Sequence, residues 1–288
     1  MLALVAAAPR PAGAADPEAA ARGAYIAASA GCEECHTDMK NGGRPFAGGR
    51  KFETRFGAVS SPNLTPDATG LGRWSAADFG RAMRWGIAPD DSHYQTLFPF
   101  PFYNRLTDAD LADLKAFLDN LAPVSRRNDS AVERSVSFGR TRNALGVAAQ
   151  PFRGPWTPDP ARDAVWNRGN YLVASIGRCG DCHTPRDALG IPVPGHFLAG
   201  TRAGPDGKKV PNITPDPQTG IGDWSEDDIA ALLQTGQTPD FDFVGGSMAE
   251  IVKSTAHLTD ADRHAISVYL RTIPAILATP ARIIPKKG

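Results

Sequence analysis

Two five-residue stretches that share the pattern Cys-x-x-Cys-His constrain this chain more than any other feature. They are Cys32–His36, the first run, and Cys179–His183, the second run, and together they contain all four cysteines. Two thiols one helical turn apart can add to the two vinyl groups of one porphyrin, and the histidine that follows can coordinate its iron. Each run therefore predicts one covalently bound haem c. The predicted attachment residues are Cys32, Cys35, Cys179 and Cys182, and the predicted proximal iron ligands are His36 and His183.

Three other uses of paired cysteines compete with this interpretation. A zinc site made of all four cysteines leaves the histidine after each pair unexplained, although it occurs twice. A thioredoxin-like redox pair needs alternating strands and helices around it, and the sequence does not show that pattern. A disulfide between the two runs gives neither histidine a role. Haem attachment is the interpretation that uses the cysteines and the histidine of both runs.

The composition fits a chain that folds around something other than its own side chains. With 288 residues it is long enough for two domains of ordinary size. Its 29 glycines and 25 prolines indicate a large share of loop, which a buried porphyrin can organise. The 31 basic residues balance 31 acidic ones, so the charge gives no indication of nucleic acid or an anionic membrane as partner.

Residues 1–15 resemble the end of a secretory signal peptide. An apolar stretch, Leu2 to Ala8, is followed by small residues around Gly13. Export agrees with the predicted haems, because haem c is attached on the outer side of the bacterial inner membrane, and the expected location is the periplasm. No later stretch has the apolar length that a membrane-spanning helix needs, so no transmembrane segment is expected.

The sequence also repeats itself at an offset of roughly 150 residues, which indicates a duplicated structural unit. Matching motifs are Gly23–Tyr25 with Gly169–Tyr171, Pro62–Asp67 with Pro211–Asp216, Trp74–Ser75 with Trp224–Ser225, and Leu106–Asp110 with Leu258–Asp262. The repeat predicts two copies of one haem-binding domain, at residues 16–123 and 161–288. Residues 124–160 are then a connecting segment.

Within each copy the sequence predicts a few helices separated by long loops. Asp16 followed by Pro17 is typical of a helix start, so a helix is expected from Pro17 to Cys32. Glycine and proline interrupt every periodic pattern between His36 and Leu71, which predicts a loop. Further predicted helices cover Ser75–Trp85 and follow the capping residues Thr107 and Thr259.

Together these features resemble two class I cytochrome c domains in tandem, a mainly α fold in which a few helices and long loops surround one covalent haem per domain. The stretches Arg168–Val173, Cys182–Arg186 and Pro211–Asp216 are similar to those of cytochrome c subunits of periplasmic alcohol, gluconate and molybdenum-containing dehydrogenases. Known alcohol and gluconate subunits carry three haems and a C-terminal membrane-binding segment. The resemblance with two haem runs therefore implies a soluble dihaem relative.

The resemblance also implies a distal iron ligand in each domain, usually a methionine from the loop before the last helix. In the second copy Met248 lies 24 residues after Trp224, directly after a Gly-Gly-Ser stretch, and is the expected ligand. The same spacing after Trp74 gives Phe98, which cannot coordinate iron. The first copy therefore departs from the pattern.

The distal ligand of the first haem is left open by the sequence. His93, five residues before Phe98, could turn inward and give bis-histidine ligation. The alternative is a solvent-exposed His93 beside a five-coordinate iron, and Tyr94 is a further candidate. Two histidines stabilise ferric iron relative to a histidine and a methionine, so the first haem is expected to have the lower potential. Electrons would then enter at the first run and leave at the second.

The predicted function is electron transfer. We expect a periplasmic dihaem cytochrome c that takes electrons from a dehydrogenase, either as a separate carrier or as its subunit, and passes them to a respiratory cytochrome or oxidase. The alternative is a dihaem enzyme with a catalytic first haem, peroxidase-like or thiosulfate-oxidising. Binding of cyanide or carbon monoxide at the first haem distinguishes the two. No catalytic constellation beyond the haems is visible in the sequence.

Overall fold

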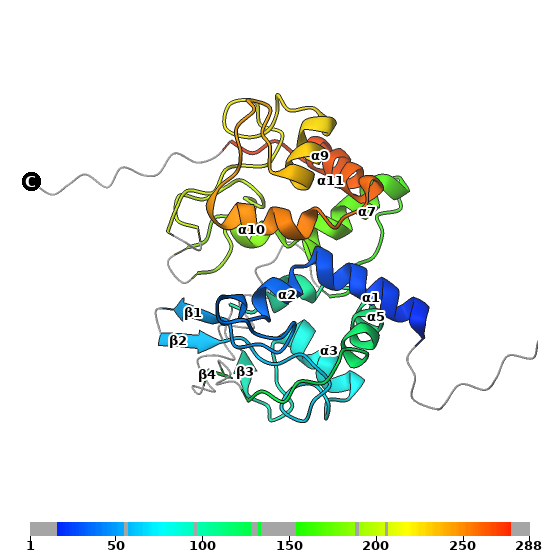
Figure 1. Ribbon diagram of the computed structural model, residues 1–288. Coiled ribbons are helices and arrows are strands. Elements are labelled where there is room, and N and C mark those ends of the chain that lie inside the picture. Colours follow the sequence, from blue (N-terminus) through cyan, green and yellow to red (C-terminus); the bar gives the residue numbers. More distant parts are fainter. Residues whose placement is uncertain are drawn as a thin grey trace, which may run out of the picture.

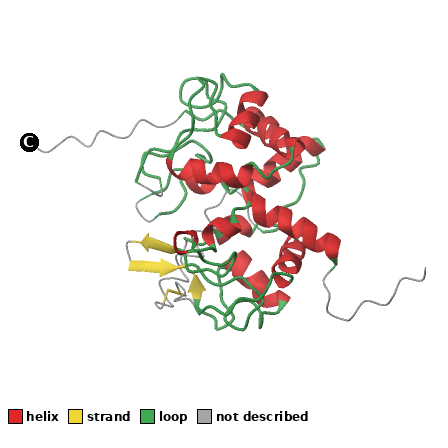
Figure 2. Ribbon diagram, viewed as in Figure 1, coloured by secondary structure: helices red, strands yellow, loops and turns green. Residues whose placement is uncertain are grey.

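The fold is mainly helical, with short strands in two small sheets (Figure 2). This computed structural model describes residues 16–54, 57–94, 97–127, 132–133, 154–187, 190–204 and 207–277. The predicted signal-peptide remnant, residues 1–15, lies outside the described residues. The segments before and after the connecting segment form two neighbouring halves of the molecule (Figure 1).

The main helices follow one another in the same order in both halves; over the residues that the structure describes, a hairpin of four-residue strands occurs only in the first half. The first half consists of α1 (Pro17–Ser29), α2 (Cys32–Cys35), the short helix η1 (Met39–Asn41), β1 (Lys51–Thr54), β2 (Gly57–Ser60), α3 (Ala76–Trp85), β3 (His93–Tyr94), α4 (Phe100–Tyr103) and α5 (Asp108–Asp119). The connecting segment contributes β4 (Val132–Glu133). The second half consists of α7 (Ala164–Tyr171), the π-helical turn η2 (Leu172–Ile176), α8 (Cys179–His183), α9 (Glu226–Thr235), α10 (Gly246–Thr255) and α11 (Asp260–Thr272).

The helix starts predicted from capping residues are confirmed. Ser75 Oγ accepts a hydrogen bond from the backbone N–H of Asp78 at 3.1 Å, and the Asp78 carboxylate accepts one in return from the Ser75 backbone. Thr107 and Thr259 cap α5 and α11 through their side chains, and Asp16 caps α1. Each capping side chain accepts hydrogen bonds from N–H groups that have no partner within the first turn of the helix. The local sequence was therefore enough to predict these helix starts.

Two local predictions were wrong. The first helix does not continue to Cys32: α1 ends at Ser29, and Gly31 adopts a left-handed φ of 67° before the separate short helix α2. Residues 36–71 are also not loop throughout, because β1 and β2 form an antiparallel hairpin that pairs Phe52 with Val59. Strands of four residues are too short to give a clear period of alternation among nearby glycines and prolines.

A pair of crossed helices builds the core of each half. Helix α1 crosses α5 so closely that a β carbon on Gly23 would lie 1.9 Å from the Asp113 carbonyl oxygen. Helix α7 crosses α11 in the same way, with 2.0 Å between such an atom on Gly169 and the Ala265 oxygen. The two glycines occupy equivalent places in the repeat, before the two haem runs. Both helix pairs therefore need a residue without a side chain at the crossing.

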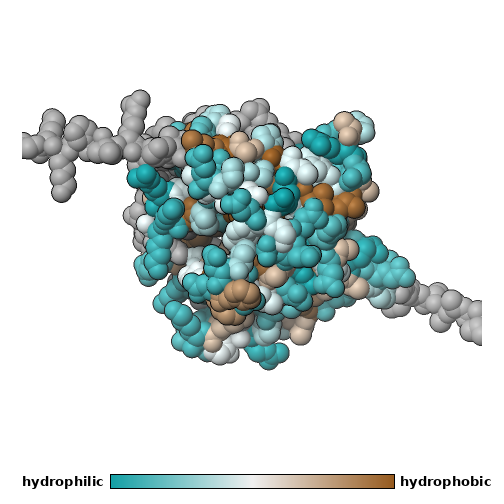
Figure 3. All heavy atoms as spheres, turned by 90° about the horizontal axis from the view of Figure 1, so that it is seen from above, coloured by the Kyte–Doolittle hydropathy of each residue, from teal (hydrophilic) through white to brown (hydrophobic). Residues whose placement is uncertain are grey.

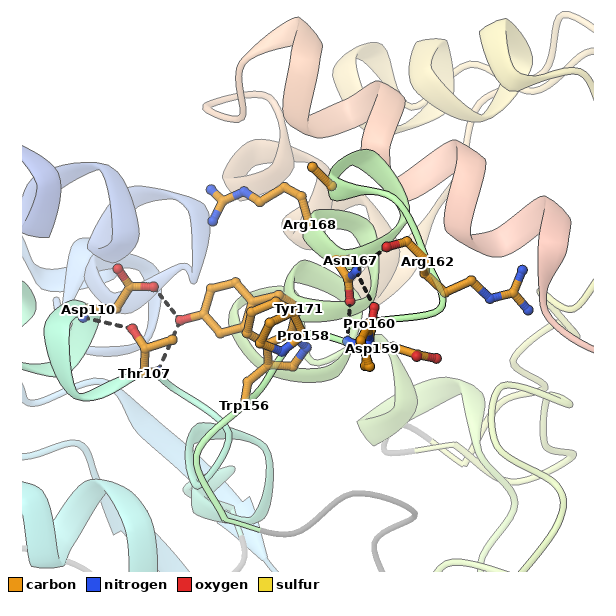
Figure 4. Close-up of a pocket in the computed structure, with 11 residues that line it drawn as sticks. Thr107, Asp110, Trp156, Pro158, Asp159, Pro160, Arg162, Asn167, Arg168 and Tyr171 are labelled. Carbon is orange, nitrogen blue, oxygen red and sulfur yellow. Dashed lines mark hydrogen bonds between the residues drawn. The ribbon is translucent and has the colours of Figure 1, made fainter.

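The halves are joined by two tyrosines that cross the interface in opposite directions, which we call the tyrosine clasp. From the second half, Tyr171 Oη donates a hydrogen bond to the Asp110 carboxylate and accepts one from the Thr107 backbone N–H at 3.3 Å (Figure 4). From the first half, the equivalent Tyr25 Oη donates to Asp262 Oδ2 at 2.5 Å. Each hydroxyl thus meets the start of the last helix of the other half.

The connecting segment packs beside this interface through Trp156. Its indole Nε1 donates to Asn170 Oδ1 at 2.8 Å, and its backbone N–H donates to the Arg105 carbonyl oxygen at 3.0 Å. The indole lies 5.2 Å from the Tyr171 ring, measured between ring centres. The segment therefore contacts both halves and lines an open pocket at the interface (Figure 4).

Polar residues cover much of the surface that Figure 3 shows. The face seen in Figure 3 is largely hydrophilic, and its hydrophobic residues form small separate groups. Across the part of the chain that the structure describes, no helix combines the length and the apolar character needed to cross a membrane.

Candidate haem-attachment sites

The first run forms a single helical turn, α2, at the inner end of α1. The left-handed backbone of Gly31 redirects the chain, and the His36 backbone N–H then donates to the Cys32 carbonyl oxygen at 2.9 Å. Cys32 and Cys35 therefore lie one turn apart on the same side of the helix. Their side chains are half-buried, as thiols that join a porphyrin edge must be.

The second run has the same local geometry. It forms α8, again after a residue in the left-handed region, here Arg178 with a φ of 41°. Cys179 and Cys182 are half-buried, and His183 at the end of the turn is buried. The four cysteines of the two runs are thiols. Both runs thus present two thiols and one imidazole from a short helical turn.

Each histidine of the two runs is oriented by a backbone carbonyl group. The Nδ1 atom of His36 lies 2.9 Å from the carbonyl oxygen of Pro62, and Nδ1 of His183 lies 2.8 Å from that of Pro211. A carbonyl oxygen only accepts, so Nδ1 carries the proton and donates. The lone pair of Nε2 is then available to a metal, which is the arrangement typical of metal-binding histidines.

Burial keeps these imidazoles in the neutral form that a ligand needs. It lowers the pKa of His36 and of His183, and the hydrogen bond to the proline carbonyl oxygen acts against that shift without cancelling it. Burial also raises the pKa of Cys32 and of Cys179 to about 12. Burial at both sites therefore disfavours the charged forms of the histidine and of the first cysteine.

The loop after each run is held in the same way in both halves. The Gly48 N–H donates to the His36 carbonyl oxygen at 2.7 Å, and the Gly200 N–H donates to that of His183 at 2.7 Å. Further along each loop, Asn63 and Asn212 each accept a hydrogen bond from a backbone N–H two residues later, at 2.9 Å. These bonds fix the turn that carries the proline oxygen to the histidine.

The residues of both runs fit a covalently attached haem. Each run supplies two thiols on one helical turn, together with a neutral imidazole whose Nδ1 proton is already used. The zinc interpretation needs all four cysteines around one point. Over the described ranges, no group of three or more histidine, cysteine or acidic side chains gathers as a metal-binding cluster.

Met248 lies in a different element from the one expected. The prediction placed it in a loop, but it is in the first turn of α10, after the exposed Gly245 and Gly246. Its side chain is half-buried. The two glycines obscured the helix in the sequence, because glycine at a helix start resembles glycine in a loop. Met248 as a distal ligand stays a prediction.

His93 is buried, so the alternative of a solvent-exposed histidine was wrong. It is 6% exposed and belongs to β3, where its backbone pairs with that of Glu133 in β4. The isolated bridge between Ile87 and His93 corresponds to one between Gln237 and Phe243 in the second half. His93 therefore takes the place of an exposed phenylalanine in the other copy. Its role as an iron ligand stays a prediction.

Phe98, the counterpart of Met248 in the repeat, sits in an aromatic cluster. The centre of its ring lies 5.7 Å from that of Tyr94, 5.8 Å from that of Tyr103 and 6.4 Å from that of Phe100. The ring is partly buried and packs against the core. In the first half, the Phe98 ring therefore occupies the position at which Met248 is predicted to bind iron in the second half.

Sequence reasoning missed the groups that orient the predicted ligands. Pro62 and Pro211 are the first residues of the repeated Pro-Asn-x-Thr-Pro-Asp motif, so the repeat pointed to these positions. Nothing in the sequence shows that their carbonyl oxygens accept hydrogen bonds from the two histidines. Sequence reasoning also missed Arg178, whose side chain reaches from the second half to the carbonyl oxygen of Ala30, two residues before the first run. The signal there was an arginine directly before a cysteine of a haem run.

Comparisons with known proteins agree with this geometry. The family model described as cytochrome c matches residues 20–122. A protein of Cereibacter sphaeroides named "Diheme cytochrome c-type" is 41% identical over 263 residues, which cover 89% of this chain and 86% of that protein.

Two further relatives are named as dehydrogenase subunits. The fructose dehydrogenase cytochrome subunit of Gluconobacter japonicus is 37% identical over 88% of this chain and 52% of its own length. The gluconate 2-dehydrogenase cytochrome c subunit of Pantoea cypripedii is 37% identical over 88% of this chain and 59% of its own length. The chain therefore spans little more than half of these two subunits.

Proposed function

Because the chain belongs to the family of dihaem c-type cytochromes represented by its 41% identical relative, we propose that it carries electrons between two haem c groups, one at each run. The observation that supports this most directly is the matched pair of histidines, each held by a proline carbonyl oxygen beside two thiols. A single haem leaves one of these equivalent sites without a function.

The proposed architecture is two class I cytochrome c domains in tandem. Residues 16–123 and 161–288 form the domains, and residues 124–160 connect them. The repeated helix crossing at Gly23 and Gly169 supports this division, as do the equivalent loop hydrogen bonds after the two runs. The connecting segment contacts both halves through Trp156, so the domains are held against each other.

The proposed roles of the site residues are supported by where these residues lie. Cys32, Cys35, Cys179 and Cys182 hold the haems, His36 and His183 are the proximal ligands, and Met248 and His93 are the proposed distal ligands. Bound haem supplies a one-electron couple between ferric and ferrous iron. Burial favours the neutral form of the proximal histidines, and the proline carbonyl oxygens fix their tautomer.

The proposed electron donor is a periplasmic dehydrogenase, and the proposed acceptor is a respiratory cytochrome or oxidase. The names of the relatives support a dehydrogenase as partner, since the fructose and gluconate enzymes each have such a subunit. A periplasmic location is proposed for the same reason and because of the predicted export signal. Whether the chain acts as a subunit or a separate carrier depends on how tightly it binds that dehydrogenase.

Reversible one-electron cycling of the purified, haem-loaded protein tests the proposal. We expect ascorbate to reduce and ferricyanide to oxidise the haems without loss over repeated cycles, and carbon monoxide to leave the reduced spectrum unchanged. Inertness to carbon monoxide follows if both irons have two protein ligands. Rapid carbon monoxide binding, together with turnover of hydrogen peroxide or thiosulfate, would instead reveal an enzyme with a catalytic first haem and refute the carrier.

A further inference from the structure

One arginine of the second half ends beside the first haem run. Arg178 directly precedes Cys179, yet its Nη2 lies 3.5 Å from the carbonyl oxygen of Ala30, two residues before Cys32. The side chain therefore leaves its own run and crosses the interface between the halves. Contacts between η2 and α4 bring this part of the second half against the first.

The backbone conformation at Arg178 is unfavourable for an arginine, which indicates that the side chain has a role at this position. Its φ of 41° lies in the left-handed region, where an arginine is strained and a glycine is not. The first copy has Gly31 at the equivalent position, with a φ of 67°. A β carbon on Gly31 would fall 2.6 Å from Ser254 Oγ, so a side chain there would have to displace the Ser254 hydroxyl. In the second copy the backbone strain at Arg178 is tolerated, and the arginine places a positive charge at the interface between the halves.

The guanidinium lies within electrostatic reach of the first site. The groups that interact with its charge are Tyr103, Cys35, Asp181 and Cys32, three of which belong to the first half. Burial raises the pKa of Cys32, and the positive charge of Arg178 acts against that rise. An arginine guanidinium keeps its charge at every pH of interest. A fixed positive charge of the second half therefore lies near the start of the first run, where the first haem is proposed to be attached.

We infer that Arg178 raises the reduction potential of the haem at the first run. The inference rests on the proposed function, because it needs a haem at each run. Adding one electron lowers the net charge of a haem by one unit, so a nearby fixed cation favours the ferrous state. Arg178 thus opposes the low potential that a bis-histidine ligand set gives the first haem, and it narrows the gap between the two potentials.

The test is a spectroscopic redox titration of the full-length, haem-loaded protein and three variants. Arg178→Gln removes the charge and Arg178→Lys keeps it. Arg186→Gln is the matched control, because Arg186 also lies beside the second run, where it pairs with Asp181 at 2.7 Å. Titration of the Cys32→Ala/Cys35→Ala and Cys179→Ala/Cys182→Ala proteins assigns each reduction step to its haem.

We expect Arg178→Gln to shift the ferrous-to-ferric ratio of the first haem at least tenfold toward ferric at a fixed potential, or about 59 mV for one electron. Arg178→Lys should shift it less than threefold, and Arg186→Gln should leave it unchanged. The inference is overturned if Arg178→Gln leaves the first step within threefold of the wild-type value or moves only the second step. The mass of each preparation is measured beforehand: too few haems would reject the proposed function, whereas two haems without the shift would reject this inference alone.

Discussion

Removing one hydroxyl group from the tyrosine clasp should weaken the whole molecule, because that group joins the two halves. Tyr171→Phe deletes the donor to the Asp110 carboxylate and the acceptor of the Thr107 N–H. The tyrosine is 3% exposed, so little water can replace the lost bonds. The phenyl ring keeps its contact with Trp156, and the change is therefore confined to polar interactions.

The expected cost follows from these two bonds. A hydrogen bond to a charged group contributes about 1.5–3 kcal/mol to stability, and one between neutral groups contributes about 1 kcal/mol. The Asp110 carboxylate is only half-buried and regains some hydration, so we expect a loss of about 1–3 kcal/mol for Tyr171→Phe. Tyr25→Phe should cost less, because its acceptor Asp262 keeps both hydrogen bonds from Arg168, at 2.8 and 2.6 Å.

Urea unfolding of the haem-loaded protein, followed by circular dichroism, measures both losses. A double-mutant cycle of Tyr171→Phe with Asp110→Asn isolates the bond across the interface, and Tyr25→Phe with Asp262→Asn isolates the reciprocal one. The halves should also unfold in one transition in the wild type. If the Tyr171 and Asp110 changes are additive to within about 0.5 kcal/mol, the hydroxyl does not couple the halves and the reasoning is refuted.

Three further perturbations test the fold and the sites. Gly169→Ala should destabilise the second half by several kcal/mol, because the new carbon would lie 2.0 Å from the Ala265 oxygen, whereas Gly245→Ala has open space and should change thermal unfolding little. Burial raises the pKa of Asp262, but the hydrogen bonds from Arg168 and Tyr25 outweigh burial, and the net pKa is lowered. The ionised carboxylate therefore stabilises the fold at neutral pH, and this stabilisation is lost as the pH falls through the lowered pKa. The pH dependence of unfolding between neutrality and strong acid should therefore flatten in Asp262→Asn, and an unchanged acid limb would contradict this. Met248→Ala should open the second haem to carbon monoxide, and a spectrum inert to the gas would rule out Met248 as the ligand.

The sequence was sufficient wherever one local interaction decides the outcome. Ser75, Thr107 and Thr259 each cap a helix within three residues, and the predicted helix starts agree with the structure. The two haem runs are also local, because a turn of helix brings their thiols together whatever surrounds it. The repeat extended this reasoning from one half to the other.

Features that depend on distant residues could not be predicted. The Pro62 carbonyl oxygen meets His36 across 26 residues, and Tyr25 meets Asp262 across 237. A single sequence does not show which backbone group or which half will face a given side chain. Short elements failed for another reason: the β-hairpin and the first turn of α10 both begin near glycines, whose conformational freedom hides the pattern of the residues that follow.

Intact-mass measurement of the full-length protein, produced with a competent haem-attachment system, tests the central claim most directly. The polypeptide should gain the mass of two haem groups, and the Cys32→Ala/Cys35→Ala and Cys179→Ala/Cys182→Ala proteins should each gain the mass of one. A wild-type protein with the mass of the bare polypeptide, or variants that keep both haems, would contradict the account.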